Sequence, residues 1–321
     1  MTSSRAKLLA TGLVSLLLAA FPVGAETSTA VVRLIVPLAP GGPSDQAARL
    51  LAKALTKTLG QEVIVENKSG ASGAIGVQAL ASAAPDGNTL LFAPSSTTGL
   101  PVLLKTPPFA SMTEFTALGA VGGNQLCLFV TPGLPVKTAQ EFIAHARANP
   151  DKLSYGASSP LEYLVMAQMM NATAITMTRI PYRGSANLMP DLLEGRVQAA
   201  FVPPGIGTQH SRSGKLKLLA CSTEKRIGAL AETPTLREVG VQGINWRPYH
   251  LVMAPAKLAP DVAARLSDAI RRAATEADVR AEYERLLIPV DVLTPAQTIE
   301  LIRESERIWA KFARESALVP E

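Results

Sequence analysis

The sequence predicts an α/β fold made of two units, with the second unit inserted into the first. Apolar segments of strand length alternate with amphipathic segments of helix length, and turns rich in Gly and Pro separate them. This alternation occurs in two blocks, and a largely helical segment follows the second block. The chain has 321 residues, 47% of them hydrophobic, which is enough to build two domains of ordinary size. We therefore expect two sheets, each flanked by helices.

The first 25 residues have the pattern of a signal peptide. Arg5 and Lys7 precede an apolar run over residues 8–21, and small residues lead up to Ala25. We expect cleavage after Ala25 and release of the mature chain into an extracytoplasmic space. No membrane insertion is expected, because the apolar run is shorter than the roughly 20 residues that a membrane-spanning helix needs.

The first unit begins with three predicted strands, at residues 33–37, 62–66 and 89–93. A helix follows the first strand, because Ala47, Leu51 and Ala54 belong to an apolar stripe with helical spacing and Gly60 ends the pattern. An Ala-rich helix follows the second strand and ends near residue 85. Short connections between alternating strands and helices indicate a parallel sheet.

The second unit repeats this alternation. It opens with a strand at residues 125–131 and a helix that runs to Asn149, and Thr138 and Glu141 have the spacing of a capping box at the start of that helix. The remaining elements are expected at residues 153–157 (strand), 161–170 (helix), 176–180 (strand), 186–194 (helix), 197–202 (strand) and 216–222 (strand).

The segment after residue 222 is predicted to return to the first unit. Helices are expected at residues 261–274 and 278–287, and a last helix begins at Thr294 with Pro295 in its first turn. The simplest arrangement packs these helices on the first unit and joins the units by two crossing strands, near residues 126–130 and 218–222. This gives a first lobe of residues 26–127 plus 223–321 and a second lobe of residues 128–222.

Composition excludes several classes of function. Removal of Arg5 and Lys7 lowers the net charge from +5 to +3, and the basic residues are scattered, so no nucleic-acid partner is expected. The three histidines have no metal-binding spacing, and no nucleotide-binding or nucleophile motif is present. We therefore expect no metal, no cofactor and no catalytic residue, and nothing in the sequence requires more than a monomer.

The only two cysteines are Cys127 and Cys221. They could pair in an oxidising compartment, and both fall near the predicted crossing strands. The favoured interpretation is nevertheless two unpaired residues buried in strands, because Cys is among the most buried residue types.

Turns rich in Ser and Gly lie between a predicted strand and the next helix at five places, and they predict a binding site. Helix starts carry unpaired amides and a partial positive charge, so such turns can hold a carboxylate without Lys or Arg. In open α/β sheets these turns also gather at the carboxyl ends of the strands, where ligands bind. The candidate ligand-binding residues in these turns are Ala39, Pro40, Gly41, Gly42, Ser44, Asp45, Ala71, Ser72, Gly73, Ser95, Ser96, Thr97, Ser158, Ser159, Arg183, Gly184 and Ser185.

Two interpretations of these turns remain open. Ser, Gly and Asp are also the residues that helix starts use as caps and turn formers. Asp45 in particular would repel an anionic ligand, so it is either a structural cap or the partner of a ligand ammonium group.

Seven stretches of the chain together resemble the Bug-type extracytoplasmic solute receptors of tripartite tricarboxylate transporters. They keep their order and extend over nearly the whole mature chain. The stretches are residues 36–49 (VPLAPGGPSDQAAR), 63–76 (VIVENKSGASGAIG), 85–93 (PDGNTLLFA), 135–156 (PVKTAQEFIAHARANPDKLSYG), 180–201 (IPYRGSANLMPDLLEGRVQAAF), 214–226 (GKLKLLACSTEKR) and 232–243 (ETPTLREVGVQG).

The resemblance implies a two-lobed periplasmic binding protein (type II-like) with two crossing hinge strands. Such a protein closes on a small carboxylated ligand and delivers it to membrane transporter subunits. It also implies that each lobe is a mixed sheet flanked by helices, and that the turns at residues 40–45, 70–73 and 182–185, which include Tyr182, line the cleft. Val202 is a further candidate ligand-binding residue. This chain departs from the family pattern in a shorter loop at Ser158 and Pro160, and in Val202 followed by two prolines. The alternatives are a receptor that signals to a membrane sensor, or a secreted hydrolase that uses Ser95 or Ser158.

Overall fold

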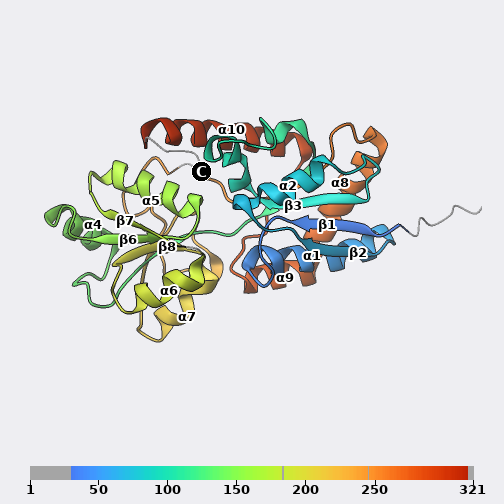
Figure 1. The fold of residues 1–321 in the computed structure, drawn as a ribbon. Helices are drawn as coiled ribbons and strands as arrows, with labels where there is room; N and C mark the ends of the chain where they lie inside the picture. Colours follow the sequence, from blue (N-terminus) through green and yellow to red (C-terminus); the bar gives the residue numbers. More distant parts are fainter. Residues whose placement is uncertain (1–29, 183, 245, 317–321) are drawn as a thin grey trace, which may run out of the picture.

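The computed structural model describes residues 30–182, 184–244 and 246–316, which form two lobes side by side (Figure 1). Within these ranges no helix has both the length and the apolar character needed to cross a bilayer. The predicted signal peptide, residues 1–25, lies outside the described residues.

The first lobe contains a six-stranded sheet in the order β11-β4-β10-β3-β1-β2. Strand β1 pairs in parallel with both β2 and β3, whereas β10 runs antiparallel to β3 and β4. The sheet therefore combines strands from the beginning and from the end of the chain. Its strands are β1 (Val32–Val36), β2 (Val63–Asn67), β3 (Thr89–Pro94), β4 (Thr116–Gly122), β10 (Tyr249–Ala254) and β11 (Val292–Leu293).

Helices cover both faces of this sheet. On one face, alternate strand residues such as Leu34 and Phe92 pack with α1, α8 and α9 in one apolar cluster. On the other face, Ile35 and Leu91 pack with α2, α3 and α10. The helices of this lobe are α1 (Pro43–Leu59), α2 (Ala74–Ala81), α3 (Leu100–Leu103), α8 (Pro260–Thr275), α9 (Ala277–Arg285) and α10 (Pro295–Glu315), with short 3₁₀ turns η1 (Ala71–Gly73), η2 (Ser95–Gly99) and η3 (Met112–Glu114).

The second lobe contains a five-stranded sheet in the order β7-β6-β8-β5-β9. Helices α4 and α5 cover one face of it, and α6 and α7 cover the other. Its elements are β5 (Cys127–Val130), α4 (Ala139–Ala148), β6 (Ser154–Ala157), α5 (Pro160–Thr173), β7 (Thr178–Pro181), α6 (Ser185–Leu193), β8 (Ala199–Val202), α7 (Pro204–Arg212) and β9 (Lys217–Cys221), and the turn η4 (Gly228–Leu230) follows β9.

The predicted strands and helices have counterparts in the structure, but the sequence analysis missed β4, β10, β11, α3 and α7. The chain crosses between the lobes twice, over residues 123–126 before β5 and over residues 242–248 before β10. The second crossing lies later than the sequence indicated, because Leu236 and Val241 still pack in the core of the second lobe.

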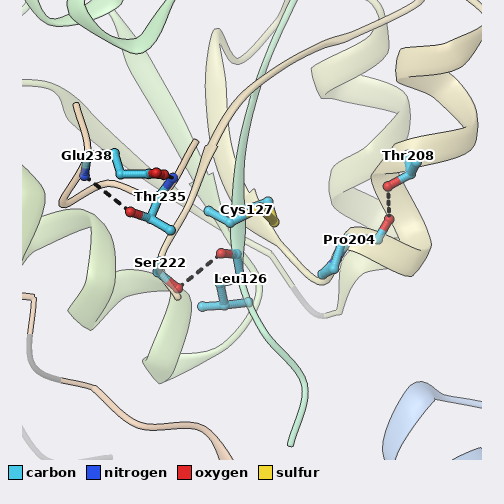
Figure 2. Close-up of a disulfide and its surroundings, with 8 residues drawn as sticks. Leu126, Cys127, Pro204, Thr208, Ser222, Thr235 and Glu238 are labelled. Atoms are coloured by element: carbon cyan, nitrogen blue, oxygen red, sulfur yellow. Dashed lines mark hydrogen bonds between the residues drawn. A yellow bond between two sulfur atoms is a disulfide. The ribbon is translucent and has the colours of Figure 1, made fainter. Parts of the chain in front are cut away.

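A disulfide joins Cys127 to Cys221, so the favoured interpretation of two unpaired cysteines is wrong. The physical reason is the strand pairing: β5 and β9 are antiparallel neighbours, and Cys127 lies directly opposite Cys221. Next to the disulfide, the backbone N–H and the hydroxyl of Ser222 both donate to the carbonyl oxygen of Leu126, at 2.8 and 3.0 Å (Figure 2). The disulfide therefore closes a loop that contains nearly the whole second lobe.

We predict that removal of this disulfide destabilises the protein. The C127A/C221A variant should lose about 2–4 kcal/mol of unfolding free energy, because the unfolded chain is no longer constrained by a long closed loop. Urea unfolding followed by far-UV circular dichroism measures this loss. Dithiothreitol should lower the stability of the wild type and leave the variant unchanged. Two titratable thiols in the unfolded, unreduced wild type would contradict the prediction.

Candidate functional site

The predicted turns lie where parallel strands of each lobe end. In the first lobe, the loop over residues 37–42 joins β1 to α1, η1 follows β2, and η2 follows β3 directly. In the second lobe, the Ser158 loop joins β6 to α5, and residues 182–184 join β7 to α6. Because β1, β2 and β3 are parallel, and β6 and β7 are parallel, the turns of each lobe share one sheet edge.

Asp45 fixes the loop that precedes α1. Its buried carboxylate accepts hydrogen bonds from the backbone N–H of Gly41 (2.9 Å), from the Arg49 guanidinium (3.0 Å) and from the Asn67 side chain (2.9 Å). Burial by itself would raise the pKa of Asp45, but these hydrogen bonds and the positive charge of Arg49 hold it below its ordinary value. Its partners all belong to the protein, which is the arrangement of a structural cap.

Ser44 connects the same loop to the sheet and to the first crossing segment. Its hydroxyl lies 3.0 Å from His250 Nε2 and accepts a hydrogen bond from Asn124 Nδ2 at 2.9 Å. The other ring nitrogen of His250 lies 2.9 Å from the carbonyl oxygen of Gly122, which can only accept. Nδ1 therefore carries the proton, and Nε2 accepts the hydrogen bond from the Ser44 hydroxyl.

His250 is fully buried and stacks on Phe92 with ring centroids 4.5 Å apart. Burial lowers the pKa of its imidazole to about 4, so the ring is neutral near pH 7. The nearly inaccessible pair of Ser44 and His250 therefore positions the loop, and both groups already have their partners.

Ser95 connects η2 to the second crossing segment. Its hydroxyl donates to the carbonyl oxygen of Arg247 and accepts from the backbone N–H of Tyr249, both at 3.2 Å. Ser95 and Thr97 are buried, whereas Ser96 is half-buried. In η1, Ala71 and Ser72 are exposed, and Gly73 is buried with a φ of +106° that an L side chain rarely adopts.

The Ser158 loop of the second lobe is organised by Glu162, which the sequence analysis did not single out. Its carboxylate accepts from the backbone N–H of Ser158 at 2.5 Å and from the Ser158 hydroxyl at 2.8 and 3.1 Å. The Ser158 and Ser185 hydroxyls lie 3.2 Å apart, so the loops before α5 and α6 meet. A serine, a proline and a glutamate at capping-box spacing were the sequence signal that could have identified Glu162.

The other expected residues of the second lobe differ in accessibility. Tyr182 is half-buried, and its hydroxyl donates to Asp191 at 2.6 Å. Val202 is fully buried in the cluster that α6 covers, so it presents no surface to a ligand. Gly184 is exposed, and Arg183 lies outside the described residues.

A hydrogen bond joins the Ser158 and Ser185 turns of the second lobe, whereas in the first lobe Gly41 and Asp45 are bonded within a single turn. Among the described residues, no hydrogen bond joins a candidate residue of one lobe to a candidate residue of the other. A cavity of about 680 Å³ lies elsewhere, between α5 and the end of α10, and another of about 510 Å³ lies beside the crossing segments. The described part of the chain has no cluster of three or more His, Cys, Asp or Glu residues able to hold a metal ion.

Comparisons with known proteins agree on one family. The family model described as tripartite tricarboxylate transporter family receptor matches residues 47–317. Protein BugT of Bordetella pertussis is 34% identical over 304 residues, which cover 92% of this chain and 93% of BugT. The structure of the periplasmic binding protein BugD matches with a TM-score of 0.77 and 27% identity, over 91% of this chain and 99% of that chain.

Two further solved structures contain small carboxylates. An R. palustris protein solved with adipate has a TM-score of 0.80 and 27% identity, over 90% of this chain and 98% of that chain. The protein MatC from Rhodopseudomonas palustris, solved with bound malate, has a TM-score of 0.73 and 27% identity over the same shares.

We predict that His250 makes the protein sensitive to mild acid. Its pKa is about 4 when folded and about 6.5 when unfolded, so the unfolded state binds more protons between these values. The contribution of the neutral ring is present above pH 6.5 and is lost as the pH falls towards 4, which amounts to about 3 kcal/mol. Urea unfolding at several pH values should show this slope in the wild type and a smaller one in H250Q. Equal slopes would contradict the prediction.

Proposed function

This chain belongs to the tripartite tricarboxylate transporter receptor family, and we propose that it captures a small carboxylated metabolite between its two lobes and delivers it to a membrane transporter of that type. The solved structures that it resembles include a periplasmic binding protein, BugD, and a periplasmic transporter. The proposal concerns the ligand class, the residues that bind the ligand and the delivery step.

The observation on which the proposal depends is the pair of sheet edges that carry helix starts. Helix α1 and the turn η2 begin at the edge of the first lobe, and α5 and α6 begin at the edge of the second. At the edge of the first lobe, the start of α1 presents backbone amides and the positive end of a helix dipole, which favour an anionic group by about 0.3–1 kcal/mol. A carboxylate can therefore bind here without a dedicated cation.

Known relatives support a carboxylate ligand. The R. palustris proteins solved with adipate and with malate share the fold over nearly the whole chain. We assign the contacts of the first lobe to the loop of Ala39, Pro40, Gly41 and Gly42 and to Ala71, Ser72 and Ser96. Five buried residues support these contacts from behind: Ser44, Asp45, Gly73, Ser95 and Thr97.

Binding is proposed to work by closure of the lobes. A ligand that touches both sheet edges stabilises the closed arrangement by its differential affinity for that state. Residues 123–126 and 242–248 are the connections that must bend. Asn124 and Arg247 lie in these connections and hydrogen-bond to the Ser44 and Ser95 turns, so bending is coupled directly to the binding loops.

A thermal-shift panel tests the proposed ligand class. Purified mature protein should melt at a higher temperature with at least one of a set of mono-, di- and tricarboxylates and amino acids. A ligand at about 100 times its Kd adds about 2.7 kcal/mol of stability. Stabilisation by neutral sugars but by no acid would contradict the proposal.

We further predict that a negative charge at Gly42 blocks binding. Gly42 is the N-cap of α1, with φ −74°, and a Cβ there would lie 3.8 Å from the carbonyl oxygen of Ala39, an ordinary van der Waals contact. Asp and Asn are both good N-caps, so G42D and G42N should fold normally. G42D should weaken binding of the best acid from the panel by about tenfold or more relative to G42N, because like charges repel. Isothermal calorimetry measures the ratio, and equal affinities would exclude this turn from the site.

A further inference from the structure

Helices α1, α4 and α5 share one local arrangement, and only in α5 is the carboxylate buried with no cationic partner among the described residues. In α1, α4 and α5 the third residue is acidic and accepts a hydrogen bond from the backbone N–H four residues earlier, from Gly41, Lys137 and Ser158 respectively. Asp45 in α1 pairs with Arg49 at 3.0 Å, and Glu141 in α4 is exposed. Glu162 in α5 is only 4% exposed, and the described residues provide it with no ion pair.

The hydrogen bonds of Glu162 fix the direction in which the neighbouring hydroxyls donate. A serine hydroxyl has one proton, and the Ser158 hydroxyl directs its proton to the Glu162 carboxylate. Towards Ser185, 3.2 Å away, Ser158 can then only accept, so Ser185 donates. The remaining lone pairs of Ser185 can accept a hydrogen bond from a ligand. While Glu162 is ionised, this cluster therefore binds hydrogen-bond donors and not anions.

The charges around the cluster do not change this conclusion. Burial raises the pKa of Tyr155 on β6, so its phenol is neutral near pH 7. Arg179 of β7 lies over the ring of Tyr163 on α5, 4.1 Å from its centroid, and Arg183 lies outside the described residues. At α6, Tyr182 donates to Asp191, which pairs with Arg196. Burial raises the pKa of Glu162 to about 7 despite the hydrogen bonds from Ser158 and Ser159, so the carboxylate is ionised in mildly alkaline solution.

We propose that Glu162 selects an amino carboxylate as the ligand, with the carboxylate group at the first lobe and the ammonium group at the Ser158 and Ser185 hydroxyls. The inference rests on the proposed function and narrows its ligand class. An ammonium group supplies hydrogen-bond donors to the hydroxyls and the positive charge that the buried Glu162 lacks. A second carboxylate at the same place would meet lone pairs and a like charge.

Matched pairs of probes test the inference by calorimetry at pH 8. The pairs are succinate with 4-aminobutyrate, glutarate with 5-aminopentanoate, and adipate with 6-aminohexanoate, in which an ammonium group replaces a carboxylate on a chain of similar length. In the pair that binds best, the wild type should prefer the amino acid by about tenfold or more, the size expected for a hydrogen-bonded charged group. The E162Q variant should lose this preference.

The pH dependence separates this role from a purely structural one. As the pH falls from 8 through about 7, Glu162 takes up a proton, so the preference of the wild type for the amino acid should shrink. The probes keep their charges over this range, since their amines and carboxylates titrate far outside it. In E162Q the ratio of affinities should be independent of pH.

E141Q is the matched control. Glu141 caps α4 of the same lobe with the same geometry, with a 2.6 Å hydrogen bond from the Lys137 N–H, but it is exposed. E141Q should keep the wild-type preference, and circular dichroism checks that both variants are folded. Equal or tighter binding of the diacids by the wild type, unchanged in E162Q, would overturn the inference. Binding of only those acids that lack an amino group would contradict the role of Glu162 and leave the receptor function intact. Failure of every acid to bind would contradict both the role of Glu162 and the proposed carboxylate ligand.

Discussion

The need to satisfy backbone amides at the starts of helices governs both halves of the candidate site. A helix leaves its first N–H groups without intrahelical partners, and here acidic side chains inside α1 and α5 turn back to hydrogen-bond the preceding loops. Asp45 and Glu162 thereby give the loops their shape, and they also use amides that an anion could otherwise contact. The two halves differ in how the negative charge of the carboxylate is balanced. Arg49 forms an ion pair with Asp45, whereas the hydrogen bonds of Glu162 come from serines. The same helix-capping geometry therefore produces two different electrostatic environments.

Buried hydrogen bonds couple these loops to the segments on which the lobes move. Asn124 belongs to the first crossing and contacts Ser44, while the carbonyl of Arg247 in the second crossing accepts from Ser95. Ser44 also donates a hydrogen bond to the neutral ring of His250, which lies on strand β10 in the interior of the sheet. A change in either crossing segment must therefore displace a turn of the first lobe. Loop position and lobe orientation are parts of one hydrogen-bonded system.

The alternation of strands and helices could be predicted because each element carries a local pattern, but several features depend on contacts between distant residues. Strand β4 contains Gly119 and Gly122, which weaken a strand pattern, yet a Cβ at Gly122 would lie 1.7 Å from the carbonyl oxygen of Pro289. The pairing of Cys127 with Cys221 follows from strand register, which no local pattern fixes. The turns of the site were predictable from their Ser and Gly content, whereas the burial of Val202 and the roles of Asn124 and His250 required the tertiary structure.

Helix α10 limits how the lobes can move. Its buried residue Ile302 packs on the first lobe. The ring of Phe312 makes a T-shaped contact with Tyr163 of α5, with ring centroids 4.9 Å apart, so the helix extends over both lobes (Figure 1). Trp309 lies between them, in contact with Phe312 and with Trp246 of the second crossing. A motion that separated these rings would expose apolar area at about 25 cal/mol per Å². In the proposed closure, a rotation whose axis passes near the aromatic cluster would keep these rings in contact while the distant sheet edges approach each other, so it would expose less apolar area than a motion that separates the rings.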